Sequence, residues 1–131
     1  MAKKVKNILV VEDDPDISRS VTFSLRKQGY KVGIANDGET GLRSVLELVP
    51  DLVILDLFLP GIPGEEICKA IREHDDEGIQ KIPIIMLTAK SQEVDRIVGR
   101  VIGANVYMTK PFVMDDLLVE IEKLTFHDKV A

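Results

Sequence analysis

The sequence predicts an α/β domain with a doubly wound, five-stranded parallel sheet and helices on both faces. Five short apolar segments recur along the chain, and segments with apolar residues at helical spacing separate them. The runs at residues 8–11 and 52–55 are wholly apolar, without alternation. Strands that are covered on both faces, as in a parallel sheet between two helical layers, show this pattern.

The first strand is predicted over residues 8–11, and a helix is predicted to begin at Pro15. Asp14 is a favourable N-cap residue, and proline suits the first helical position. Gly29 is a C-cap signal at the end of this helix. A second strand is predicted over residues 31–35.

Two further helices flank the third strand, which is predicted over residues 52–56. Helical spacing marks the earlier of the two through Leu42, Val45, Leu46 and Val49. The later helix is predicted over residues 65–73, after a loop at residues 60–64. The polar residues 74–81 are predicted to form a surface connection.

The last third of the chain continues the alternation of strands and helices. The fourth strand is predicted over residues 83–88, the fifth over residues 105–108, and the last helix over residues 113–124. A helix between these two strands is marked by Val94, Ile97, Val98, Val101 and Ile102, with Gly103 as its cap.

Length and composition limit the class of protein. The 131 residues suit a single domain, predicted over residues 1–131 with its core at about 7–124. The net charge of −5 is a poor match for nucleic acid. Cys68 is the only cysteine, which excludes an internal disulfide and favours a reducing, cytoplasmic location. No apolar run is long enough to span a membrane.

Polar side chains follow the predicted strands at their carboxyl ends, where a sheet of this kind forms its ligand crevice. These residues are Glu12, Asp13, Asp56, Thr88 and Lys110. Three neighbouring carboxylates stay ionised only beside a compensating cation, and Mg²⁺ prefers such oxygen ligands. A carboxylate beside Mg²⁺ and a lysine can attack phosphorus, because both cations neutralise the phosphoryl oxygens.

The motifs around these residues resemble the receiver domains of two-component response regulators, including the chemotaxis regulators. The matching segments are residues 10–15, 50–56, 59–61, 87–89 and 107–112, and the resemblance extends from about residue 7 to residue 124. It implies a flavodoxin-like strand order of 2-1-3-4-5. It also implies a regulator that catalyses only phosphoryl transfer to and from its own aspartate, and is not otherwise an enzyme.

The resemblance assigns roles to the residues at the strand ends. Asp56 is expected to accept the phosphoryl group from a sensor histidine kinase or a phosphotransfer protein. Asp13 is expected to bind Mg²⁺ directly and Glu12 to assist through water. The backbone carbonyl of Phe58 would complete the protein ligands, and Mn²⁺ could substitute for Mg²⁺. Phe58 and Lys90 occupy positions that tune the lifetime of the phosphoryl group.

The resemblance also implies a switch. Thr88 is expected to contact the phosphoryl group, and Lys110 to pair with Asp56 or its phosphate. Tyr107 matches the switch aromatic, which turns inward and remodels the face made by the fourth main helix, the fifth strand and the last helix. The Lys110–Pro111 bond is expected to be cis, which is essentially a proline phenomenon.

The expected partners are the kinase and either a downstream protein or an output domain, with no direct binding of nucleic acid and no membrane association. The initial Met1 and the plain tail at residues 125–131 favour a stand-alone receiver, and a longer protein with an output domain stays open. A chain that only binds partners, as a degenerate receiver, is disfavoured by the complete set of site residues.

Two other classes of function fit less well. A phosphatase of the haloacid-dehalogenase type would need a second aspartate two residues after Asp56, where this chain has Phe58. A flavin or nucleotide binder would need a phosphate-cradling loop, and the sequence has neither GxGxxG nor GxxxxGK[ST].

Overall fold

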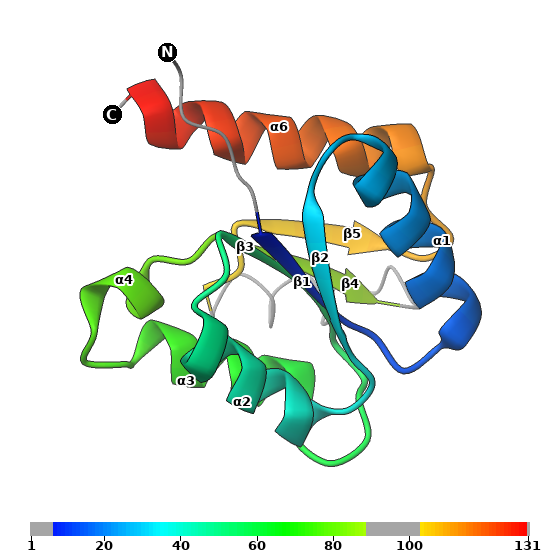
Figure 1. The fold of residues 1–131 in the computed structure, drawn as a ribbon. Helices are drawn as coiled ribbons and strands as arrows, with labels where there is room; N and C mark the ends of the chain where they lie inside the picture. Colours follow the sequence, from blue (N-terminus) through cyan, green and yellow to red (C-terminus); the bar gives the residue numbers. More distant parts are fainter. Residues whose placement is uncertain (1–6, 89–102, 131) are drawn as a thin grey trace.

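The structure is a computed structural model that describes residues 7–88 and 103–130, with the side chains of residues 125–130 left out (Figure 1). The elements are β1 (Asn7–Val11), α1 (Pro15–Lys27), β2 (Lys31–Ala35), α2 (Gly38–Leu48), β3 (Leu52–Asp56), α3 (Gly64–Arg72), α4 (Glu77–Gln80), β4 (Ile84–Thr88), β5 (Val106–Thr109) and α6 (Met114–Val130). The helix predicted around residues 94–102 and the position of Lys90 lie outside the described residues.

The five strands form one parallel sheet in the order β2-β1-β3-β4-β5, which confirms the predicted fold class and strand order. Figure 1 shows α1 and α6 on one face of the sheet and α2, α3 and α4 on the other. Every residue of β3 and β4 is buried, as their continuous apolar sequences predict. Because all strands run the same way, their carboxyl ends meet at one edge of the sheet.

Alternate side chains along the strands divide the core into two clusters. Leu9 and Val11 of β1 point toward α2 and α3, and Ile8 and Val10 point toward α1 and α6. Each fully buried aliphatic side chain contributes about 1.5–3 kcal/mol to folding. Cys68 of α3 is buried in the first cluster, as expected for a small apolar residue.

The segment predicted as a surface connection, residues 74–81, is mostly exposed, but it contains the short helix α4, which the prediction did not include. The Asp76 side chain caps this helix by accepting hydrogen bonds from the backbone N–H groups of Gly78 and Ile79, at 2.8 and 3.3 Å. Ile79 is buried and anchors the helix to the core. One apolar residue among polar neighbours has no helical periodicity, so the sequence pattern does not indicate this helix.

The last helix also differs from its prediction, because α6 continues to Val130 and does not end near residue 124. Residues 125–130 contain neither glycine nor proline, so nothing in the sequence stops the helix there. None of the helices that the structure describes is both long and apolar enough to cross a membrane.

The guanidinium of Arg72, at the end of α3, forms hydrogen bonds with α4 and with the segments that precede β4 and β5. It donates hydrogen bonds to the backbone oxygens of Gly103, Gln80 and Ile82, at 2.9, 2.8 and 2.8 Å. It also donates to the Asn105 side-chain oxygen at 2.8 Å, which in turn accepts from the Ile84 backbone N–H. These contacts fix the beginnings of β4 and β5 and so help to set where both strands end.

Val49, which follows α2, has a left-handed backbone with φ of 45°. This conformation is costly for a β-branched residue, whereas glycine adopts it freely. Because the side chain is exposed, Val49→Gly should remove strain with little loss of burial. We expect its free energy of unfolding to rise by about 1 kcal/mol in urea titrations. Val113→Gly, at another exposed valine, should be neutral or destabilising, and an equal gain there would contradict the strain argument.

Candidate functional site

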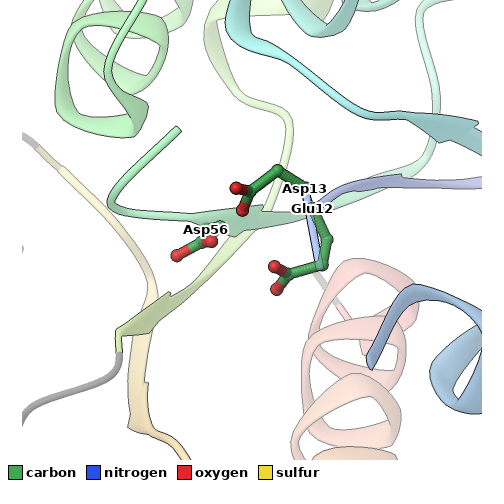
Figure 2. A group of neighbouring side chains, drawn as sticks. All are labelled: Glu12, Asp13 and Asp56. Carbon is green, nitrogen blue, oxygen red and sulfur yellow. The ribbon is translucent and has the colours of Figure 1, made fainter. Parts of the chain in front are cut away.

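Three carboxylates converge at the carboxyl edge of the sheet. One oxygen from each of Glu12, Asp13 and Asp56 lies within 4.8 Å of the others. Figure 2 shows these side chains turned toward a common space from the ends of β1 and β3. Glu12 and Asp56 are only 1% and 4% exposed, whereas Asp13 is exposed. The cluster is therefore a buried acidic pair with a third carboxylate on its open side.

Local hydrogen bonds hold Glu12 in place directly after β1. Its backbone N–H donates to the Ala35 carbonyl of β2 at 3.0 Å, which extends the sheet pairing by one residue. The Asp14 N–H donates to Glu12 Oε2 at 3.0 Å. Asp14 itself caps α1, accepting hydrogen bonds from the N–H groups of Asp16 and Ile17. The start of α1 thus also orients the first carboxylate of the site.

Asp56 is the last residue of β3, and its position depends on the loop that follows. Asp56 Oδ1 accepts a hydrogen bond from the Phe58 N–H at 3.2 Å. The loop returns so that the Gly64 N–H donates to the Leu57 carbonyl at 2.9 Å. A Cβ atom at position 64 would overlap the Asp56 carbonyl oxygen. Glycine is therefore required where α3 starts against the strand that carries Asp56.

Lys110 joins two of the carboxylates from the end of β5. Its Nζ lies 2.8 Å from Glu12 Oε1 and 3.2 Å from Asp56 Oδ2. Its backbone N–H donates to the Thr88 carbonyl at 2.6 Å, and the following bond to Pro111 is cis, as the resemblance implied. The resemblance pairs Lys110 with Asp56 or its phosphate and does not indicate the shorter contact with Glu12. The position of Glu12 directly after a buried strand could have indicated this contact, because a buried carboxylate needs a positively charged partner.

The charges of the site do not balance. Formally, the three carboxylates and the one ammonium of Lys110 leave a charge of −2 among these four residues. Burial raises the pKa of Asp56 to about 7, the negative charge of Glu12 adds to the rise, and Lys110 opposes it. Burial disfavours the charged form of Lys110, but its contacts with Glu12 and Asp56 outweigh that effect and raise its pKa. A divalent cation would therefore stabilise the site by neutralising its excess negative charge.

The cluster also fits Mg²⁺ by geometry. Mg²⁺ binds oxygen at about 2.0–2.1 Å, so ligand oxygens on opposite sides of the ion lie about 4 Å apart. Oxygens of Asp13 and Asp56 lie within 4.8 Å of each other, so both could contact one ion after moving closer, with Glu12 reached through water. The exposed Asp13 leaves the site open to the water molecules that Mg²⁺ usually keeps.

The remaining predicted residues lie around this cluster. Thr88 is fully buried at the end of β4, in register with Thr109 of β5. Tyr107 is half-buried on β5 beside Met86. Phe58 is 56% exposed although its backbone contacts Asp56. The structure thus brings Glu12, Asp13, Asp56 and Lys110 into one site, with Thr88 at the neighbouring strand end.

A parallel 2-1-3-4-5 sheet with an acidic cluster at its carboxyl edge is the architecture of a signalling receiver. The family model for the response regulator receiver domain matches residues 8–122, and the chain belongs to that family.

Individual relatives agree with this assignment. The "DNA-binding response regulator MtrA" of Mycolicibacterium smegmatis is 42% identical over 116 residues, which cover 88% of this chain and 49% of the relative. This chain therefore spans about half the length of that relative.

Solved structures also match along nearly the whole chain. A candidate response regulator from Chloroflexus aurantiacus superposes with a TM-score of 0.85 at 36% identity, over 92% of this chain and 98% of the other. The chemotaxis response regulator CheY4 of Vibrio cholerae gives 0.83 at 29% identity, over 92% of this chain and 98% of the other.

Proposed function

We propose that this receiver domain accepts a phosphoryl group on Asp56 in a reaction that requires Mg²⁺. The observation that carries the proposal is the position of Asp56: a buried carboxylate 3.2 Å from Lys110, beside two further carboxylates that leave the site with excess negative charge. An isolated buried aspartate would be protonated, whereas one beside cations is available as a nucleophile.

In this proposal Asp13, Asp56 and the backbone carbonyl of Phe58 hold the ion. Both oxygens of Glu12 already have partners, Lys110 and the Asp14 N–H, so Glu12 would act through a bound water. When bound, Mg²⁺ supplies positive charge to the phosphoryl oxygens in the transition state. Mn²⁺ would fit the same ligand set.

The chain's own residues would carry the transfer. A carboxylate oxygen of Asp56 forms a bond to phosphorus while the bond from phosphorus to the donor atom breaks. Lys110, fixed by Glu12, stays beside Asp56 and neutralises a phosphoryl oxygen. The Thr88 hydroxyl would contact another phosphoryl oxygen, and Tyr107 would respond from the adjacent strand β5.

The proposed partners follow from this chemistry. A sensor histidine kinase or a phosphotransfer protein would supply the phosphoryl group. A downstream protein, or an output domain in a longer protein of the MtrA kind, would read the changed surface around β5 and α6. We propose that residues 1–131 form the single receiver domain of this system.

The proposal is tested by the intact mass of the protein after incubation with acetyl phosphate, with Mg²⁺ or with EDTA. We expect a gain of one phosphoryl mass with Mg²⁺ and no gain with EDTA. The circular dichroism spectrum should be the same in both buffers, which excludes unfolding as the cause. A folded protein that gains no mass with Mg²⁺, or gains it equally in EDTA, would refute the proposed reaction.

Phe58 is expected to slow the loss of the phosphoryl group, because its backbone N–H contacts Asp56 and its exposed side chain, next to the site in the chain, would restrict the approach of water if it covers the phosphoryl group. Phe58→Ala should shorten the half-life of phosphorylated Asp56 by roughly threefold to tenfold. This corresponds to a fall of about 1 kcal/mol in the activation free energy of hydrolysis when the shielding group is lost. The half-life is measured by intact mass after removal of the phosphodonor. Val113→Ala, also at an exposed apolar residue, is the control, and equal decay in both variants would contradict shielding by Phe58.

A further inference from the structure

A second surface feature lies between α1 and β2 and shares no residue with the acidic site. It is a groove of about 470 Å³, within the size range of ligand pockets. We call it the basic groove, and its lining residues are Arg19, Thr22, Phe23, Arg26, Lys27 and Ile34. Figure 1 shows α1 packed beside β2, which is the edge strand of the sheet.

The floor of the basic groove is apolar and open to solvent. Phe23 is 64% exposed, and Ile34 of the edge strand is also exposed. Covering these two exposed apolar side chains with a partner would remove apolar surface from water, which favours binding. The two side chains come from different elements, so together they form a shallow site for an apolar anchor.

The rim of the basic groove is positively charged and partly held in place. Arg26 Nη2 donates a hydrogen bond to the Val32 carbonyl of β2 at 3.2 Å, which fixes its guanidinium beside the edge strand. Lys27 Nζ lies 5.5 Å from the centre of the Phe23 ring, within the range of a cation–π contact. Arg19 adds a third positive charge, and the described lining includes no carboxylate.

This local excess of positive charge contrasts with the chain as a whole, whose net charge is −5. A nucleic acid would extend its phosphate charge beyond the groove and meet repulsion from the acidic rest of the protein, whereas a short segment can stay within the groove, and three cations around an apolar floor are few for phosphate binding. A short peptide with carboxylates on both sides of one apolar side chain matches both the rim and the floor.

We propose that the basic groove binds an acidic peptide segment of a partner protein, whose aromatic or large aliphatic side chain packs against Phe23 and Ile34. The carboxylates of this segment pair with Arg19, Arg26 and Lys27. This interaction surface is separate from the phosphorylation site, so it can be tested without phosphorylation.

The test begins with a random peptide library displayed on phage, selected on the wild-type chain after depletion on a Phe23→Ala, Arg19→Gln double variant. We expect the enriched peptides to be acidic and to share an aromatic or large aliphatic residue. A synthetic consensus peptide is then titrated into the ¹⁵N-labelled protein. Its amide shift changes should be confined to α1 and β2, and its affinity should fall as NaCl is raised.

Matched variants separate the two parts of the proposal. Phe23→Ala should weaken binding of the consensus peptide by about tenfold, whereas Leu48→Ala, at a residue 66% exposed outside the groove, should leave it unchanged. Arg19→Gln should weaken binding by about threefold to fivefold, and Arg43→Gln on α2 should not. Both groove residues lie at the surface, and circular dichroism confirms that the variants fold.

Several outcomes would overturn the proposal. Enriched peptides that are neutral or basic, or that bind the Phe23→Ala variant equally well, would exclude it. Failure of the selection to enrich any peptide for the wild-type chain over the double variant would also exclude it. A single-stranded oligonucleotide that shifts the same amides more strongly than the consensus peptide would assign the groove to nucleic acid.

Discussion

Asp56→Asn is expected to abolish phosphorylation by acetyl phosphate in the presence of Mg²⁺. The amide keeps the size of the side chain but removes the nucleophilic oxygen charge and one ligand of the ion. Asp75→Asn, at an exposed acidic residue outside the site, removes the same charge from the chain and should be phosphorylated like the wild type. The measurement is intact mass over time. A phosphoryl gain in the Asp56→Asn variant would place the acceptor elsewhere.

Loss of phosphorylation in this variant should be accompanied by a gain in stability. The pKa of Asp56 is about 7 in the folded protein against an ordinary value near 3.8. Because the folded state holds the proton more tightly, the stability of the metal-free wild type falls as pH rises from about 4 to about 7. At pH 8, Asp56→Asn should raise the free energy of unfolding by roughly 2–4 kcal/mol in EDTA.

The stability gain of Asp56→Asn should shrink at low pH and with Mg²⁺. Near pH 4, Asp56 of the wild type is already protonated and uncharged. The variant therefore removes no buried charge at this pH and gains little stability. Saturating Mg²⁺ stabilises the wild type more than the variant, because only the wild type keeps the third carboxylate. Urea titrations at both pH values check this. Equal stability of variant and wild type at pH 8 in EDTA would show that the carboxylates do not repel one another as the structure indicates.

Lys110→Ala is expected to cause the second large loss, in both phosphorylation and stability. The substitution leaves buried Glu12 without its ion-pair partner and removes the ammonium beside Asp56. Removing one partner of a buried ion pair typically costs about 3–5 kcal/mol. The rate of phosphorylation should fall at least about a hundredfold, because one preorganised positive group is lost from the transition state.

The pH dependence identifies the cause of the Lys110→Ala defect. The contacts with Glu12 and Asp56 raise the pKa of Lys110, so in the wild type its ammonium stabilises the fold across the neutral range. Without it, nothing opposes the raised pKa of Asp56, and the stability deficit should be larger at pH 8 than at pH 5. A deficit independent of pH would point to lost packing and not to unpaired charge.

Two controls accompany Lys110→Ala. Lys81→Ala removes an exposed ion pair with Glu77 and should change the free energy of unfolding by less than about 0.5 kcal/mol. Lys110→Arg keeps the positive charge in a different shape, so it should restore most of the stability but only part of the rate. Equal rates for the arginine variant and the wild type would mean that charge alone matters at this position.

Much of the fold could be predicted because the chain alternates two clear periodicities. The first four residues of β3 and of β4 are all apolar, so the burial of these strands between two helical layers could be predicted directly. The helix α4 and the extension of α6 could not be predicted in this way. Ile79 is one apolar residue with no periodic neighbours, and residues 125–130 lack the stop signal that would have marked an end.

The sequence by itself determined which residues stand at the strand ends. It also determined that they share one site, because parallel strands place all their carboxyl ends on one edge of the sheet. Glu12, Asp13, Asp56 and Lys110 were predicted to share a site on that basis, and the structure brings them together. Only the tertiary structure decided that Lys110 lies closer to Glu12 than to Asp56. Such pairing depends on the lengths of side chains from strands far apart in sequence, and no local pattern encodes it.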